Sequence, residues 1–253
     1  MNLVDTADVY GLDWGGTGFG LNEEILGRVL ANAPELRPQM VLATKGGILP
    51  PTPYNSGADY LREACEASLR RLQTDVIDLY QIHRPDLYTH PAEVADTLVS
   101  LRSEGKIREV GVSNFTPTQT EALQHFLPFP LVSDQPQFSV THLDPLWDGT
   151  ADAAMMHNRI LLAWSPLGGG ALATGEGLEA GLLAVIDELA EREAVSRAAL
   201  AVAFVLAHPS KPVAVVGSQN PDRLTDMMSA VDVHLDRADV YRLIQASMGQ
   251  PLP

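Results

Sequence analysis

Residues 76–83 read VIDLYQIH, and residues 91–104, PAEVADTLVSLRSE, follow them after a short turn. The first stretch is mostly apolar without strict alternation, which is typical of a strand covered on both faces, and the second has the apolar spacing of an amphipathic helix. We predict the same order of strand and helix on either side of this pair. Because strands that alternate with helices pair in parallel, the sequence predicts an α/β fold around a parallel sheet.

The predicted strands are short and are spread along the whole chain. They cover residues 3–5, 41–45, 76–83, 107–112, 131–135, 160–164 and 213–217. Predicted helices cover residues 22–33, 57–73, 91–104, 116–126, 145–158, 179–193 and 220–231, with two more at 196–208 and 236–248. A strand and its helix recur about every 30 residues, and this spacing fits both an eight-unit barrel and an open doubly wound sheet.

Composition limits the class of protein. With 45% hydrophobic and 19% charged residues among 253, the chain has enough apolar material for a sizeable core, and we expect a single domain. The formal net charge of −15 argues against nucleic acid and anionic membranes as partners. The single cysteine, Cys65, excludes an intrachain disulfide, and its helical spacing with Leu61 and Leu69 predicts a buried position. No apolar run approaches the ~20 residues needed to span a bilayer, and the N-terminus lacks the basic and apolar regions of a signal peptide. We therefore expect a cytoplasmic protein.

Chemically capable side chains stand at the predicted carboxyl ends of three strands. Asp5, Lys45 and His83 occupy these places, and Tyr10 follows Asp5 by five residues. In a barrel such strand ends meet on one face, where active sites are built. Each residue alone has an ordinary structural explanation: a capping aspartate, a solvated lysine, a packed histidine and a loop tyrosine. The combination of these residues is far more specific than any one of them.

Six segments, in this order, carry a resemblance to a known family. They are VDTADVYG (4–11), ATKGG (43–47), LYQIHRPD (79–86), GKIREVGVSNFTP (105–117), AWSPLGGG (163–170) and VVGSQNPDRL (215–224). Together they resemble the aldo-keto reductase superfamily along nearly the whole chain. The resemblance implies a TIM-type (β/α)8 barrel over residues 1–253. Members usually begin one strand and one helix earlier, so we expect an N-terminally truncated barrel of about seven units.

The resemblance also implies that Asp5, Tyr10, Lys45 and His83 form the catalytic tetrad of a carbonyl reductase. Reduction of a carbonyl by hydride needs a proton donor at the oxygen that becomes negative, and the phenol of Tyr10 can supply it. A cation at Lys45 would make this phenol more acidic, and Asp5 would hold that cation. His83 would position the carbonyl oxygen by a hydrogen bond.

A hydride carrier is required because these four side chains have no redox group of their own. The resemblance implies NADP(H). Ser113, Asn114 and Gln135 match the family's positions around the carboxamide of nicotinamide, and Trp164 stands where many members have a stacking tyrosine. Glycines at 15, 16, 18 and 20 do not fit the Rossmann pattern G-x-G-x-x-G, so they are interpreted as a loop.

The phosphate groups of the cofactor are expected farther along the chain. Ser165 and the run from Leu167 through Gly168 to Gly170 would let the backbone approach a pyrophosphate. Ser218 and Arg223, at the start of a predicted helix, would bind a 2′-phosphate and favour NADP over NAD. Gly217 replaces a lysine that some members place on this phosphate.

The substrate is predicted only as a class of small molecule. Trp14, Phe19 and Trp147 lie in or near loops, where they would either favour an aldehyde or ketone with an apolar part or pack the loops onto the barrel. No metal is expected, because the remaining histidines lack ligand spacing. Two alternatives stay open: a nonenzymatic NADP(H)-binding regulatory subunit with this fold, and a lyase that uses Lys45 as a Schiff base.

Overall fold

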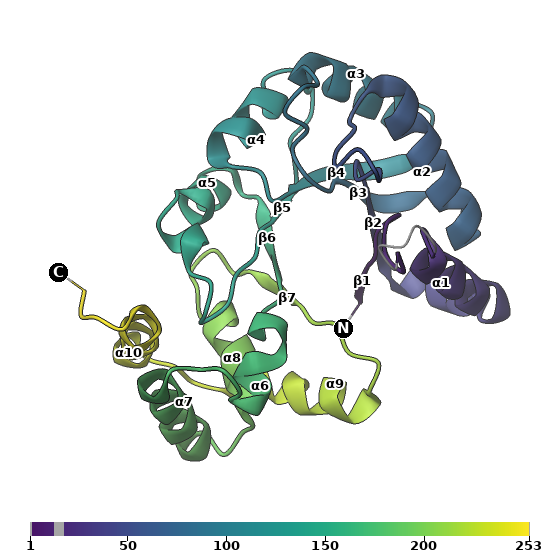
Figure 1. Cartoon of the computed structure of the whole chain (residues 1–253). Helices are drawn as coiled ribbons and strands as arrows, with labels where there is room; N and C mark the ends of the chain where they lie inside the picture. Colours follow the sequence, from purple (N-terminus) through teal and green to yellow (C-terminus); the bar gives the residue numbers. More distant parts are fainter. Residues whose placement is uncertain (1, 13–17, 253) are drawn as a thin grey trace. The chain divides into compact units, whose positions relative to one another are not determined.

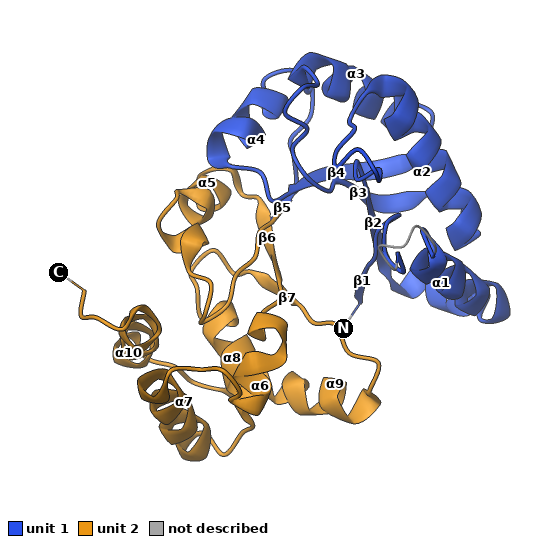
Figure 2. Cartoon of the chain, in the orientation of Figure 1, with its two compact units in different colours: residues 1–134 blue, residues 135–253 orange. Residues whose placement is uncertain are grey.

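A computed structural model describes residues 2–12 and 18–252. The chain divides into two compact units, residues 1–134 and residues 135–253 (Figure 2). The strands are ordered in the sheet as they are in the chain. Each unit is described below by itself.

Unit 1 contains four parallel strands that pair in chain order. They are β1 (Leu3–Asp5), β2 (Val41–Gly46), β3 (Ile77–Ile82) and β4 (Ile107–Ser113). Four helices lie outside these strands (Figure 1), namely α1 (Leu21–Asn32), α2 (Ala58–Leu72), α3 (Pro91–Ser103) and α4 (Pro117–Gln124). A 3-10 helix, η1 (Pro34–Gln39), leads from α1 toward β2.

The core of unit 1 lies between these strands and helices. Leu42 of β2, Leu61 of α2, Ile77 of β3 and Leu98 of α3 are fully buried in one apolar cluster. Cys65 of α2 belongs to the same cluster, and burial raises the pKa of its thiol to about 12. The thiol is therefore un-ionised at neutral pH and acts as a small apolar side chain.

Unit 2 begins with the end of β5 (Ser133–Gln135), and in it β6 (Ile160–Trp164) pairs in parallel with β7 (Val213–Val215). Its helices are α5 (Thr150–His157), α6 (Ala171–Thr174), α7 (Ala180–Arg192), α8 (Arg197–Leu206), α9 (Pro221–Met228) and α10 (Arg237–Met248). Short 3-10 turns are η2 (Asp144–Leu146), η3 (Gly168–Gly170) and η4 (Ser229–Asp232).

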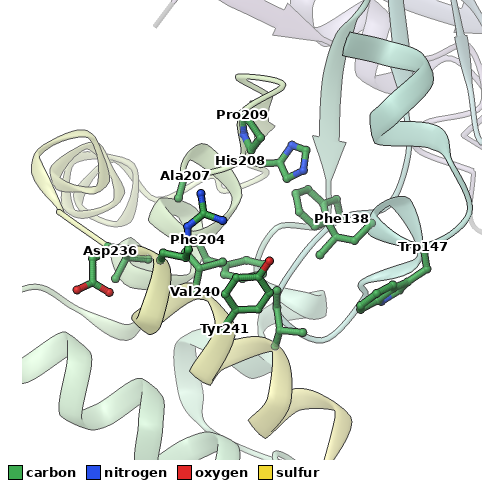
Figure 3. Close-up of a pocket in the computed structure, with 13 residues that line it drawn as sticks. Phe138, Trp147, Phe204, Ala207, His208, Pro209, Asp236, Val240 and Tyr241 are labelled. Carbon is green, nitrogen blue, oxygen red and sulfur yellow. The ribbon is translucent and has the colours of Figure 1, made fainter. Parts of the chain in front are cut away.

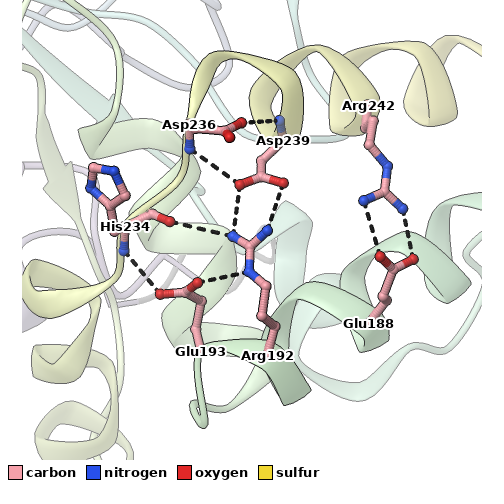
Figure 4. A network of polar contacts seen from close by, with 7 residues as sticks. All are labelled: Glu188, Arg192, Glu193, His234, Asp236, Asp239 and Arg242. Atoms are coloured by element: carbon pink, nitrogen blue, oxygen red, sulfur yellow. Dashed lines mark hydrogen bonds and ion pairs between the residues drawn. The ribbon is translucent and has the colours of Figure 1, made fainter.

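Ion pairs join α7 to the C-terminal helix α10 (Figure 4). Arg192 donates to both carboxylate oxygens of Asp239, at 2.8 and 2.7 Å, and to Glu193 at 2.8 Å. A second forked pair joins Arg242 to Glu188, at 3.0 and 2.6 Å. The hydrogen bonds from Arg192 lower the pKa of Asp239, so this carboxyl is ionised at neutral pH. The two pairs fix the side of α7 on which α10 packs.

Each predicted strand is present in the described part of the chain, but two predicted helices are interrupted. The segment 145–158 separates into η2 and α5, because Gly149 has a φ of 87° and starts α5 in the left-handed region. The segment 220–231 changes from α9 to η4 at Ser229. Within residues 2–12 and 18–252, no helix has the length and apolar character that crossing a membrane requires.

Candidate active site

Four predicted residues gather at the carboxyl ends of the strands of unit 1. Asp5 is the last residue of β1, and Tyr10 lies in the turn that follows it. Lys45 stands near the end of β2, and His83 directly follows β3. Parallel pairing of β1, β2 and β3 aligns these strand ends, so side chains from separate stretches become neighbours.

Lys45 is the centre of this group. Its ammonium is fully buried and donates to Asp5 Oδ2 at 2.6 Å, to the carbonyl oxygen of Thr6 at 2.8 Å and to Tyr10 Oη at 3.3 Å. All three ammonium hydrogens therefore have an acceptor, and the Asp5 carboxylate compensates the buried positive charge. Because Tyr10 Oη accepts from Lys45, the phenol hydrogen of Tyr10 can point to another partner.

Tyr10 and His83 stand edge to face, with ring centroids 5.7 Å apart. Both line a cavity of about 1040 Å³ in unit 1. Its other walls come from the loops after β1, β2 and β3, and include Val9, Leu12, Ile48, Pro50, Pro51, Pro53, Tyr54 and Arg84. The cavity thus combines the polar ends of Tyr10 and His83 with a largely apolar rim.

The imidazole of His83 is neutral at neutral pH. Burial, followed by the positive charges of Lys45 and Arg84, lowers the pKa of its imidazole to about 3. In the described part of the chain, no group forms a hydrogen bond with His83 Nδ1, although this atom is buried. A neutral imidazole has one N–H and one acceptor nitrogen, so His83 is suited to orient a ligand and cannot donate as an imidazolium.

Two buried polar residues beside this group were not predicted from the sequence. Gln81 Nε2 donates to Asp5 Oδ1 at 3.3 Å. Asp8 is fully buried, and burial, followed by the nearby Glu23 carboxylate, raises the pKa of Asp8 to about 8. One signal for Gln81 was available: it is a polar residue in a buried strand and stands two positions before His83, so both side chains lie on the same face.

Two predicted cofactor positions lie next to His83 in unit 1. Ser113 is the last residue of β4, and Asn114 has a left-handed backbone with φ of 59°, which asparagine tolerates. The amide of Asn114 donates to Ser113 Oγ at 2.8 Å and to the His83 carbonyl at 3.3 Å. These bonds attach the loop after β4 to the end of β3.

In unit 2, three predicted cofactor positions lie at the end of β6 or just after it. Trp164 ends this strand, Ser165 has a φ of 53°, and Leu167 precedes η3, whose three glycines all have positive φ. A Cβ added at Gly169 or Gly170 would meet nothing within 4 Å, so the backbone is open there. The expected amide donors are already used, because the amide of Gly168 donates to the Ser165 carbonyl and that of Gly169 to Ser165 Oγ. Gln135, the last residue of β5, is buried.

Ser218 and Arg223 lie at the start of α9. Asn220 caps this helix by accepting from the amides of Asp222 at 2.9 Å and Arg223 at 3.4 Å, while Ser218 Oγ accepts from the amide of Asn220 at 3.2 Å. The guanidinium of Arg223 is exposed and forms no ion pair with another described residue. An anion such as a phosphate has access to it.

The predicted aromatic residues occupy different places. Trp14, with Gly15 and Gly16, lies outside the described residues. The ring of Phe19 is 5.9 Å from the guanidinium carbon of Arg71. Trp147 lines a separate pocket of about 530 Å³ within unit 2, formed by α8, α10 and η2 (Figure 3). In the part of the chain that the structure describes, no three or more potential metal ligands come together.

Comparisons with known proteins agree with this architecture. The model of the Aldo/keto reductase family matches residues 1–247. A 6-dehydroglucose reductase of Novosphingobium aromaticivorans is 48% identical, over 100% of this chain and 83% of its own length. Another 6-dehydroglucose reductase, from Agrobacterium fabrum, is 35% identical over 99% of this chain and 84% of its own.

Solved structures give the same result. A glycerol dehydrogenase from Gluconobacter oxydans superposes with a TM-score of 0.84 at 29% identity, covering 100% of this chain and 84% of its own. A thermostable aldo-keto reductase in complex with the inhibitor epalrestat gives a TM-score of 0.83 at 26% identity, with 96% and 81% covered. The predicted fold class, a (β/α) barrel with parallel strands, is confirmed.

Proposed function

Because the chain belongs to the aldo/keto reductase family and is an oxidoreductase, we propose that it reduces an aldehyde or ketone to an alcohol with NADPH. The observation that carries the proposal is the contact of the Lys45 ammonium with both Asp5 and Tyr10. We include in the proposal that residues 1–253 act as one catalytic domain. The single cysteine supports a cytoplasmic location.

Enzymes of this family use a nicotinamide cofactor, which when bound supplies the hydride. The residues present fit such a group in two respects. The backbone after β6 is open at Gly169 and Gly170, although the amides of Gly168 and Gly169 would have to leave Ser165 to donate to a phosphate, and the Asn114 amide stands beside His83. In the proposal, the positions that hold the cofactor are Ser113, Asn114, Gln135, Trp164, Ser165, Leu167, Gly168, Ser218 and Arg223.

Tyr10 is the proton donor in this proposal. Its oxygen accepts from Lys45, so its own hydrogen is directed to the substrate oxygen that becomes an alkoxide. When the proton leaves, the phenolate is stabilised by the ammonium 3.3 Å away. The Asp5 carboxylate, 2.6 Å away, compensates the charge of the buried Lys45 ammonium.

His83 orients the carbonyl in this proposal. With a pKa of about 3 it stays neutral, and its single N–H is available to the carbonyl oxygen. The proton of the product alcohol therefore comes from Tyr10 and not from an imidazolium. This division of roles gives one acid and one orienting group for the same oxygen.

The exposed guanidinium of Arg223, at the first turn of α9, supports the choice of NADPH over NADH. Arginine binds phosphate through a planar fork, and a helix N-terminus favours an anion. The same end of α9 carries Ser218, whose hydroxyl is turned to the Asn220 amide. Together they offer a charged and a neutral donor for the 2′-phosphate that only NADPH has.

The substrate we propose is a hydroxylated aldehyde of the size of a sugar. Two relatives, at 48% and 35% identity, are named 6-dehydroglucose reductases. The cavity beside Tyr10 and His83 has a volume of about 1040 Å³ and contains polar groups on Tyr54 and Arg84 as well as three prolines. Such walls suit a ligand that presents both C–H faces and hydroxyl groups.

The replacement Tyr10→Phe tests the proposal, because it removes the acid and keeps the ring. We expect kcat for aldehyde reduction to fall by about 10²- to 10⁴-fold, while NADPH binding, followed by fluorescence, stays within twofold. The wild type is assayed first with 6-dehydroglucose and a panel of simple aldehydes. If the wild-type protein binds NADPH but oxidises it with none of the carbonyl compounds tested, the proposed enzyme activity is refuted and the regulatory subunit is favoured. Trapping of Lys45 by borohydride would favour the lyase.

A further inference from the structure

Gln81 lies in a row of residues that crosses the strands of unit 1 at the level of the tetrad. In the parallel register, Lys45 of β2 pairs with Gln81 of β3, and Gln81 pairs with Gly111 of β4. Paired residues in a parallel sheet point to the same side, so the amide of Gln81 and the ammonium of Lys45 share one face. Gln81 is fully buried.

The two ends of the Gln81 amide have different partners. Its Nε2 donates to Asp5 Oδ1 at 3.3 Å, while its Oε1 accepts from the Ser133 hydroxyl at 3.5 Å. A carboxylate only accepts and an ammonium only donates, so the direction of every bond from Ser133 to Lys45 is fixed. Asp5 Oδ1 faces Gln81, and Asp5 Oδ2 faces Lys45 at 2.6 Å.

Gly111 provides the room for this arrangement. A Cβ at this position would lie 2.1 Å from Ser133 Oγ and 3.2 Å from the Cγ of Gln81. Any side chain there would push Ser133 or Gln81 out of place. The backbone of Gly111 does not need a left-handed conformation, so the requirement for glycine is one of space.

We propose that Gln81, held by Ser133, is a positioning residue that orients Asp5 so that Asp5 keeps the Lys45 ammonium against the Tyr10 hydroxyl. This inference rests on the proposed function. An amide suits the position because it donates to Asp5 without adding charge. A carboxylate in its place repels Asp5, and an apolar chain leaves Asp5 Oδ1 without this donor.

The variant Gln81→Met keeps the length of the side chain and removes the donor. We expect kcat to fall about 10- to 100-fold, with KM for the aldehyde and Kd for NADPH within threefold of the wild type. Gln81→Glu restores a donor only when it is protonated. Its kcat is therefore low at pH 8 and recovers at least fivefold relative to the wild type at pH 6, because two adjacent carboxyl groups share one proton.

The matched control is Gln124→Met in α4. This variant also removes two amide hydrogen bonds, to the Phe129 carbonyl at 2.9 Å and from the Leu131 amide at 2.7 Å, but among the described residues of unit 1 Gln124 forms no hydrogen bond with Asp5 or Lys45. We expect this variant to melt at a lower temperature and to keep kcat within twofold. If Gln81→Met does not fold, Ser133→Ala is measured in its place, with an expected loss in kcat of about 3- to 10-fold.

Three results separate the outcomes. Wild-type reduction together with a Gln81→Met kcat within twofold overturns the positioning role and leaves the proposed function intact. A Gln81→Glu profile parallel to that of the wild type between pH 6 and 8 also overturns it. A wild type without any NADPH-dependent reduction overturns the proposed function itself, and the positioning role falls with it.

Discussion

Asp8 is a buried carboxyl group that forms no ion pair with another described residue of unit 1. The nearest guanidinium, that of Arg71, is bound to Glu23 Oε2 by Nε at 2.8 Å and Nη2 at 2.7 Å. Asp8 has a backbone hydrogen bond at Val9 and a distant side-chain partner, Tyr60 Oη at 3.5 Å, while Tyr60 donates its proton to the Ile48 carbonyl at 3.0 Å. A protonated Asp8 can donate to the Tyr60 oxygen, which agrees with its raised pKa of about 8.

This raised pKa makes stability depend on pH in a predictable direction. Between pH 4 and pH 8 the folded protein keeps the Asp8 proton and the unfolded chain has lost it, so the free energy of unfolding decreases as the pH rises. The slope approaches about 1.4 kcal/mol per pH unit. Asp8→Asn mimics the protonated acid and removes this slope. We expect the variant to gain stability relative to the wild type from pH 5 to pH 8 in urea titrations, and equal pH dependence in both proteins would contradict the expectation.

At the scale of single residues, the sequence predicted which four side chains lie together, but it did not predict the residues that surround them. Asp5, Tyr10, Lys45 and His83 stand at strand ends, where position along the chain already indicates a shared face. Gln81 reaches Asp5 through the register between strands, Asp8 is buried in the turn after β1, and Gly111 leaves the space that this arrangement needs. None of these properties is visible until β2, β3 and β4 are paired.

Helix α1 depends on one close approach to α2. Gly27 of α1 faces the C-terminal turn of α2, and a Cβ at this position would lie 2.0 Å from the Arg71 carbonyl oxygen. Because the obstacle is backbone, it cannot rotate away as a side chain would. The gain in helix propensity from alanine is therefore outweighed by the clash.

We expect Gly27→Ala to lower the free energy of unfolding by about 1–3 kcal/mol in urea titrations. The control is Gly181→Ala in the first turn of α7, where a Cβ meets nothing within 4 Å. That change should be neutral or stabilise the protein by up to about 1 kcal/mol. Equal destabilisation by both substitutions would mean that the contact between α1 and α2 is not the cause.

At the scale of elements, the types of helices and strands were predictable, and short turns were not. Thr116 and Pro117 indicated the start of α4, and a capping box with Gln119 is present there. The 3-10 segment η1 and the short helix α6 were missed, because each is too short to show a period. The break at Gly149 could have been anticipated, since glycine readily starts or ends a helix in the left-handed region.

At the scale of the whole chain, the proposed chemistry and the proposed choice of cofactor belong to different stretches of sequence. The tetrad lies between Asp5 and His83 in unit 1, and the predicted phosphate positions Ser218 and Arg223 lie in unit 2. A change at Arg223 should therefore alter cofactor preference without altering the proton donor. Sequence similarity supports the family, but the preference for NADPH depends on these individual side chains.

Arg223→Ala tests this separation in steady-state kinetics. We expect KM for NADPH to rise about 10- to 100-fold, because a guanidinium bound to a phosphate dianion is lost, while KM for NADH changes less than threefold. At saturating NADPH, kcat should stay within twofold, since Tyr10 and Lys45 are unchanged. Arg237→Ala is the control, because Arg237 is likewise an exposed arginine in the first turn of a helix, α10, and should leave both KM values as they are. An equal rise in KM for NADPH and NADH would show that Arg223 does not bind the 2′-phosphate.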